Sequence, residues 1–275
     1  MSKLFLTDLD HTFLRDDLSI SNYSKTIWNS MAKNHIMGIA TARTYKKSEQ
    51  FLRGLHINTP MILLDGSLII TPEKKIVDMK VLSKKVADEI IHCGSKLGIY
   101  PFVLALKDRD LNEAFLYPTK TNPHQSELLL RYKGDDNLQE CSDIKGMQDN
   151  FKLVYFGEKN QLEELQNNLQ SIFKDEIKYL LAPEAYLGCY FLTLLHKSAD
   201  KAHGLKKVRE ITQIDYKDFT VFGDNLNDLG MFKLSQISVA VANAQEEVKK
   251  IATVISDYNN NEDAVAKYLE SISLY

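Results

Sequence analysis

The chain has 275 residues, of which 44% are apolar and 26% charged, with a formal net charge of −3 and a pI near 6.2. This composition supports a packed core and excludes an intrinsically disordered chain, and the slight acidic excess argues against a nucleic-acid-binding protein. Because the sequence shows no signal peptide, no membrane-length apolar stretch and no CxxC pair among its three cysteines, we expect a cytoplasmic protein with free thiols that does not associate with a membrane.

The first third of the chain alternates short apolar segments with amphipathic ones. Ser21 is a candidate cap for a helix with apolar positions at Tyr23, Ile27 and Met31, and Asp65-Gly66 predicts a tight hairpin turn. Strands are expected at Leu4–Leu6, Gly38–Ala40, Met61–Leu64 and Leu68–Ile70, and a second helix at Lys46–Leu55.

The last third repeats this alternation. Strands are expected at Tyr190–Leu195, Phe219–Phe222 and Ser238–Val241, and helices at Asp200–Ile211, Leu226–Phe232 and Gln245–Ala252. Short buried strands that alternate with helices are typical of a parallel sheet covered on both faces. The sequence therefore predicts an α/β fold with a Rossmann-like parallel sheet and helices on both of its faces.

The middle third does not repeat this regular alternation of strands and helices. Helices are expected at Leu82–Leu97 and Gln161–Phe173, and strands at Phe102–Leu106, Ala114–Leu116, Leu153–Phe156 and Tyr179–Ala182. We interpret residues 81–185 as an inserted α+β domain, and residues 1–80 and 186–275 as one Rossmann-like core.

Polar motifs follow the predicted parallel strands, where ligands of open α/β sheets bind. Taken singly, each motif is better explained as a solvated turn, a helix cap or a surface charge. Their shared position at one sheet edge is what favours a functional site. The motifs are Asp8-Leu9-Asp10-His11-Thr12, Thr41-Ala42-Arg43, Lys201, and Gly223-Asp224-Asn225-Leu226-Asn227-Asp228.

A converging set of carboxylates would require a cation. If Asp8, Asp224 and Asp228 meet, each like-charge pair at about 4 Å costs about 4 kcal/mol at an effective dielectric constant near 20. Carboxylate oxygens suit Mg²⁺ better than a softer metal, and the scattered histidines and cysteines offer no zinc site. We therefore expect a Mg²⁺ cofactor.

These motifs, in this order, resemble the haloacid dehalogenase superfamily of phosphohydrolases: DxDxT, a Thr after the second strand, a Lys, and GDxxxD. The segments Lys201–Leu205 and Val239–Lys249 are similar to the Cof-like subfamily of sugar-phosphate phosphatases. That subfamily carries an α/β cap between its second and third motifs, which is where residues 81–185 lie. Asp65-Gly66-Ser67 departs from the usual Asn-Gly-Ala, so Asp65 could alter the edge of the pocket.

The resemblance implies a role for each catalytic residue. Asp8 would be the nucleophile that forms an aspartyl-phosphate, and Asp10 would protonate the leaving oxygen and then activate water. Thr41 and Lys201 would hold the phosphoryl oxygens. The presence of Asp10 favours phosphoester chemistry, because displacement of a halide needs no proton.

The resemblance also implies a ligand set. Mg²⁺ would be held by Asp8, the backbone carbonyl of Asp10, Asp224 and Asp228. Arg43 would contact the substrate, and Asn227 would orient the phosphate or Lys201.

The expected function is a phosphatase that acts on a small phosphorylated metabolite, such as a sugar phosphate. The alternatives are a phosphomutase on the same kind of substrate and a non-enzymatic switch that is phosphorylated on aspartate. The sequence makes no prediction of the physiological substrate or of the oligomeric state.

Overall fold

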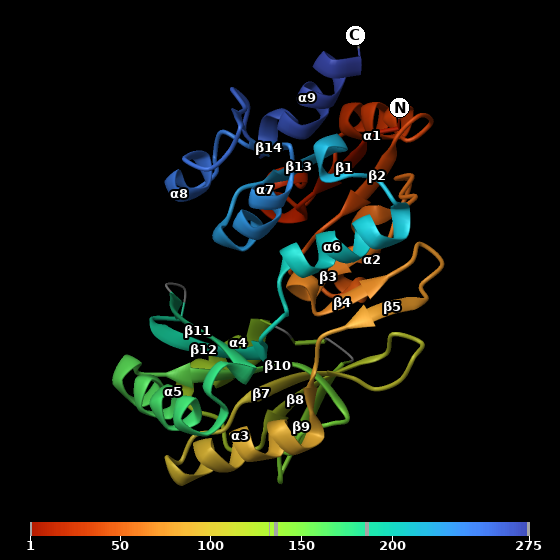
Figure 1. Cartoon of the computed structure of the whole chain (residues 1–275). Helices are drawn as coiled ribbons and strands as arrows, with labels where there is room; N and C mark the ends of the chain where they lie inside the picture. The colour runs from red at the N-terminus through yellow and green to blue at the C-terminus, as the bar shows by residue number, and fades with distance from the viewer. Residues whose placement is uncertain (1, 132, 135–136, 185–186, 274–275) are drawn as a thin grey trace. The chain divides into compact units, whose positions relative to one another are not determined.

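The computed structural model describes residues 2–131, 133–134, 137–184 and 187–273, and the chain forms two compact units (Figure 1). The first unit comprises Met1–Met79 and Asp200–Tyr275, and the second comprises Lys80–Ala199. Residues 185 and 186, where we expected the insert to end, lie outside the described ranges. Each unit has its own sheets.

The first unit contains a sheet in which every neighbouring pair of strands is parallel, as predicted. Its order is β15-β14-β13-β1-β2, so the chain steps from β1 to β2 on one side and returns through β13 on the other. The carboxyl ends of β1 and β13 therefore meet at a topological switch point, the usual place for a ligand in such a sheet. The strands are β1 (Leu4–Thr7), β2 (Ile36–Ile39), β13 (Phe219–Gly223), β14 (Ile237–Ala240) and β15 (Val254–Ile255).

Helices cover both faces of this sheet. Side chains alternate between the two faces along each strand, so both faces carry apolar side chains that the helices bury. Leu4 and Leu6 belong to a buried cluster with residues of α6 and α7. Phe222 points to the other face, where its ring contacts Tyr268 of α9, and α9 packs beside α1 (Figure 1). The helices of this unit are α1 (Asn22–Met31), α2 (Tyr45–Leu52), α6 (Lys201–Thr212), α7 (Leu229–Leu234), α8 (Glu246–Lys249) and α9 (Ala264–Ser273).

A small antiparallel sheet adjoins the carboxyl end of β2. It consists of β3 (Met61–Leu63), β4 (Leu68–Ile70) and β5 (Ile76–Met79). The hairpin predicted at Asp65-Gly66 is confirmed, since β3 and β4 pair across a tight turn over Leu64–Gly66. A parallel bridge between Ala40 and Ile62 places this turn next to the loop that follows β2.

The second unit has the α+β character predicted for the middle third. Its sheet has the order β11-β12-β10-β7-β8-β9, with β6 paired to β10, and among the described residues only β8 and β9 pair in parallel. Residues of α3 and α5 form its buried core with the sheet. The elements are β6 (Leu82–Ser83), α3 (Lys84–Lys96), β7 (Phe102–Leu106), β8 (Glu113–Pro118), α4 (Pro123–Arg131), β9 (Leu138–Cys141), β10 (Asp149–Gly157), α5 (Lys159–Phe173), β11 (Ile177–Glu184) and β12 (Cys189–His196).

One strand lies in a different sheet from the one expected. Tyr190–Leu195 is a strand, but the prediction that it belongs to the parallel sheet is wrong. It forms β12, which pairs antiparallel with both β10 and β11 in the second unit. The apolar pattern of this segment predicts a buried strand, but it does not predict which strands will pair with it.

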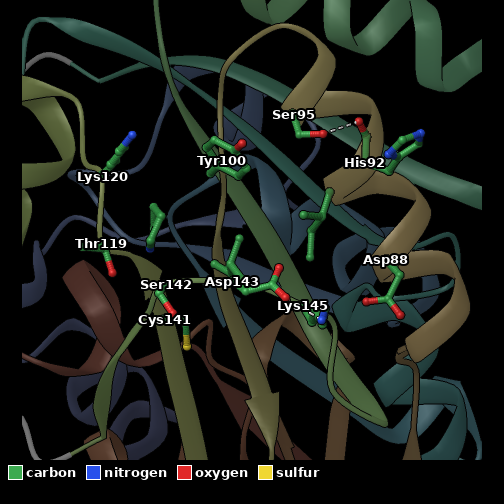
Figure 2. A pocket seen from close by; sticks show the side chains of 13 residues that line it. Asp88, His92, Ser95, Tyr100, Thr119, Lys120, Cys141, Ser142, Asp143 and Lys145 are labelled. Atoms are coloured by element: carbon green, nitrogen blue, oxygen red, sulfur yellow. Dashed lines mark hydrogen bonds and ion pairs between the residues drawn. The ribbon is translucent and has the colours of Figure 1, made fainter.

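The second unit also contains a cavity of about 730 Å³ between one face of α3 and the ends of β8 and β9 (Figure 2). Asp88, His92 and Ser95 line the α3 side. Asp143 and Lys145 lie on the opposite loop, where they form an exposed ion pair. None of the residues predicted to carry chemistry lines this cavity.

Within the described residues, none of the helices combines the length and the apolar character that crossing a membrane requires. Cys93, Cys141 and Cys189 are free thiols.

Candidate active site

The first motif curls toward β13 directly after β1. The backbone N–H of Asp8 donates to the carbonyl of Phe222 (3.1 Å), which continues the pairing between the two strands. Leu9–Phe13 then forms one irregular helical turn in which His11 has a left-handed φ of 54°. The turn brings the hydroxyl of Thr12 to Asp224 Oδ1 (2.9 Å), so the first and fourth motifs are in contact.

The fourth motif folds back on itself around Asp228. Its Oδ2 accepts hydrogen bonds from the backbone N–H groups of Asp224 (3.0 Å) and Asn225 (3.1 Å). A β-carbon at Gly223 would lie 2.4 Å from this same oxygen, so the position requires glycine. The loop therefore holds Asp228 rigidly, with its other oxygen facing the centre of the site.

Lys201 enters the site from the first turn of α6. Its ammonium lies 2.7 Å from Asp8 Oδ1 and 2.7 Å from Asp228 Oδ1, and the side chain is completely buried. The prediction that Lys201 follows a strand of the parallel sheet is wrong, because the preceding strand is β12. Its position depends on α6, which packs closely on β3, since a β-carbon at Gly204 would lie 2.4 Å from the side chain of Ile62.

The carboxylates of Asp8, Asp224 and Asp228 form a buried cluster whose ligand oxygens all lie within 4.8 Å of one another. Burial and the charge of Asp228 raise the pKa of Asp224 to about 6. Burial also raises the pKa of Asp8, against the opposing effect of Lys201. For Lys201, burial would lower the pKa, but Asp8 and Asp228 outweigh it and keep the ammonium charged.

Three carboxylates against one ammonium leave an excess of negative charge in a buried space. A cation at the cluster would offset this excess, and an all-oxygen donor set suits a hard divalent ion. The residues present therefore fit a metal site.

Thr41 follows β2 at the same edge of the parallel sheet as Asp8, which follows β1. The backbone N–H of Ala40 donates to the carbonyl of Thr7 (2.9 Å), so the residues that follow each strand are adjacent. Thr41 is completely buried, and its hydroxyl accepts a hydrogen bond from the N–H of Arg43 (3.1 Å).

Arg43 holds Asp10. Its Nε donates to Asp10 Oδ2 (2.7 Å) and its Nη2 donates to the other oxygen. This two-point ion pair fixes the orientation of the carboxylate. Arg43 was predicted to contact substrate, and the contact observed here is with the proposed acid and base.

Asn227 lies at the exposed rim, where its amide donates to Asp65 Oδ1 (2.8 Å). Asp65 in turn donates its backbone N–H to the carbonyl of Thr41 (3.0 Å). The sequence analysis assigned no role to Thr12 or Gly223, and to Asp65 only an effect on the edge of the pocket. Thr12 and Gly223 were nevertheless part of the quoted motifs, and Asp65 was noted as a departure from the resemblance.

A family model of haloacid dehalogenase-like hydrolases matches residues 5–269. The chain belongs to this family. This confirms the resemblance stated from the motifs, and with it the prediction of a hydrolase of phosphoric monoesters.

Relatives within this hydrolase family cover nearly the whole chain. The 5-amino-6-(5-phospho-D-ribitylamino)uracil phosphatase YitU of Bacillus subtilis is 24% identical over 272 residues, which is 97% of this chain and 96% of the relative. Phosphatase YwpJ of the same organism is 22% identical and covers 98% of this chain and 99% of its own.

Solved structures share the fold. TM0651 of Thermotoga maritima superposes with a TM-score of 0.79 at 24% identity, over 98% of this chain and 97% of its own. The subclass IIB sugar phosphatase BT4131 superposes with a TM-score of 0.72 at 17% identity, over 100% of both chains. Proteins of this fold combine a core with a cap domain, and the predicted fold class is confirmed.

Proposed function

We propose that this hydrolase is a Mg²⁺-dependent phosphatase that acts on a sugar phosphate or a similar small polyol phosphate through a phosphoaspartyl intermediate on Asp8. The observation that carries the proposal is the placement of Asp8 beside a buried, charged Lys201 and within one cluster with Asp224 and Asp228. The names of the relatives support the substrate class, since one acts on a phosphorylated ribityl group and another is a sugar phosphatase.

The first step is displacement at phosphorus. An oxygen of Asp8 forms a bond to phosphorus as the ester P–O bond breaks, and the leaving oxygen takes a proton from Asp10. Lys201 and Thr41 bind the phosphoryl oxygens and stabilise the charge that develops on them. Arg43 keeps Asp10 oriented at the rim of the site.

The second step regenerates the enzyme. Asp10 takes a proton from water, whose oxygen bonds to phosphorus while the bond from phosphorus to Asp8 breaks, and inorganic phosphate leaves. Mg²⁺ held by Asp8, the Asp10 carbonyl, Asp224 and Asp228 would neutralise charge on the transferring group.

We further propose that the second unit, Lys80–Ala199, is the cap domain, and that the first unit is the catalytic core. An inserted domain of this kind excludes water and supplies contacts to the part of the substrate that is not phosphate.

The test is release of inorganic phosphate from a panel of sugar phosphates, with Asp8→Asn as the comparison. We expect the wild-type protein to release phosphate and the variant to release none. Equal release by both proteins would contradict the role of Asp8, and an isomeric sugar phosphate formed without phosphate release would indicate a mutase.

A further inference from the structure

The turn between β3 and β4 has an unusual backbone. Leu64, Asp65 and Gly66 have consecutive positive φ angles of 49°, 54° and 88°. Non-glycine residues avoid this left-handed region because their β-carbon crowds the backbone, and leucine does so strongly. Such backbone persists where surrounding contacts impose it, and it is concentrated at functional sites.

The surrounding contacts come from the candidate active site. Leu64 donates its N–H to the carbonyl of Arg43 (3.1 Å), and Asp65 donates its N–H to the carbonyl of Thr41. A β-carbon at Gly66 would lie 2.0 Å from the carbonyl oxygen of Asp200, the residue before Lys201. The turn therefore packs between the loop that contains Thr41 and Arg43 and the start of α6.

The result is a half-buried carboxylate at the rim of the site. Asp65 accepts the amide of Asn227, and its negative charge acts on Lys201, whose pKa it helps to raise. Lys201 and Arg43, the cations placed at this edge in the described part of the chain, are engaged by carboxylates: Lys201 by Asp8 and Asp228, and Arg43 by Asp10. The carboxylates that they face are Asp8, Asp10, Asp65, Asp224 and Asp228.

We propose that Asp65 is a specificity-determining residue that disfavours a second anionic group on the substrate, so that the site prefers phosphate monoesters with a neutral hydroxyl-bearing or cationic leaving group. This inference rests on the proposed function. One divalent cation does not fully offset these five carboxylates, and a bound phosphoryl group adds further negative charge. A second carboxylate or phosphate on the substrate beside Asp65 is therefore repelled.

A purely structural role does not explain the charge of Asp65. Asparagine adopts the left-handed conformation as readily as aspartate, and its side-chain oxygen would still accept the amide of Asn227. The feature that only aspartate supplies is a negative charge. Asp65→Asn therefore removes the charge while it preserves the turn and the hydrogen bond.

The experiment uses two aryl phosphates of the same shape, para-carboxyphenyl phosphate and the neutral para-carbamoylphenyl phosphate. We expect wild-type kcat/KM to favour the neutral ester by about tenfold, and Asp65→Asn to reduce this preference about tenfold through the KM of the anionic ester. Because screening weakens charge repulsion, added salt should also reduce the wild-type preference. Glu73→Gln, which removes an exposed carboxylate of the same unit outside the site, should keep the wild-type ratio.

The outcomes separate the two levels of the proposal. Active wild-type protein with equal kcat/KM for both esters, or a ratio that Asp65→Asn leaves unchanged, would overturn the role of Asp65 alone. Absence of phosphate release from either ester, or release that survives Asp8→Asn, would overturn the proposed function and this inference with it. The wild-type ratio and its salt dependence decide the question even if the variant does not fold.

Discussion

Charged residues are used differently at the carboxyl edge of the parallel sheet and at the cavity of the second unit. At the sheet edge, the side chains of Lys201 and Asp228 are 0% exposed and that of Asp8 is 9% exposed. At the cavity, the side chains of Lys145 and Asp143 are 64% and 73% exposed although they too form an ion pair (Figure 2).

The two regions differ in the desolvation free energy that the charged groups incur when the chain folds. A surface ion pair contributes about 0–1 kcal/mol to the stability of the fold. Burial of several charges instead carries a large desolvation penalty, which apolar side chains packed in the same place would not incur. A fold keeps such a cluster where the charges perform chemistry. The size of the cavity is therefore a poorer guide to catalysis here than the burial of the charges.

The largest expected effect comes from loss of the Asp8 carboxylate, compared with loss of the Asp143 carboxylate at the cavity. Asp8→Asn should lower kcat for phosphate release at least about 10⁴-fold, because it removes the nucleophile. Asp143→Asn removes the same charge from the cavity and should change kcat by less than about twofold. Similar losses in both variants would break the contrast between the two regions.

Removal of the metal should be nearly as severe. We expect EDTA to stop turnover and Mg²⁺ to restore it. Mg²⁺ at about 100 times its Kd should stabilise the fold by about 2.7 kcal/mol, or roughly 5–10 °C in Tm.

Thermal unfolding provides the control for the metal experiment. The rise in Tm should persist in Asp143→Asn and should be lost in Asp224→Asn, because only the second variant alters the buried cluster. Turnover that is insensitive to EDTA would refute the metal site.

Asp10→Asn tests the proposed role of the half-buried Asp10 as general acid and base. The amide oxygen can still accept a hydrogen bond from Arg43, but the side chain can no longer exchange a proton. Turnover should fall by about 10²–10⁴-fold. The inhibition constant for inorganic phosphate should change little, and an unchanged kcat would assign Asp10 to structure.

The smallest effect concerns stability at a site away from the chemistry. Burial alone would raise the pKa of Asp263, but hydrogen bonds from Arg15, Ser21 and Ser24 together lower it. The folded state therefore binds this proton less readily than the unfolded state, so the contribution is present above the unfolded pKa and is lost as the pH falls.

We expect Asp263→Asn to reduce the free energy of unfolding by about 1 kcal/mol at neutral pH and by less in acid. Asparagine tolerates the φ of 63° at this position, so backbone strain does not confuse the comparison. Urea unfolding at both pH values measures the difference, with Asp143→Asn as the exposed control. A larger loss in acid than at neutral pH would contradict the sign of the shift.

Much of the fold could be predicted because local patterns carry it. The hydroxyl of Ser21 caps α1 as its position suggested, and Phe102–Leu106 is a strand with the predicted limits. The short elements β5, β9, β15 and α4 were not predicted. The terminal helix α9 was also missed.

The clustered carboxylates could be proposed because Asp8 and Asp224 directly follow strands and Asp228 belongs to the same motif as Asp224. The contacts of Arg43 with Asp10 and of Asn227 with Asp65 could not, since they join side chains from separate loops. Nothing in the local sequence of either loop specifies its neighbour.

The sequence by itself determined that the polar motifs follow the ends of predicted strands. Both the apolar pattern of a strand and the composition of a turn are properties of a few consecutive residues. Only the tertiary structure decided which sheet receives β12, how α6 delivers Lys201 to Asp8, and that Asp65 faces the site. Those outcomes depend on packing between segments far apart in the chain, where burial and charge are settled jointly by all the neighbours.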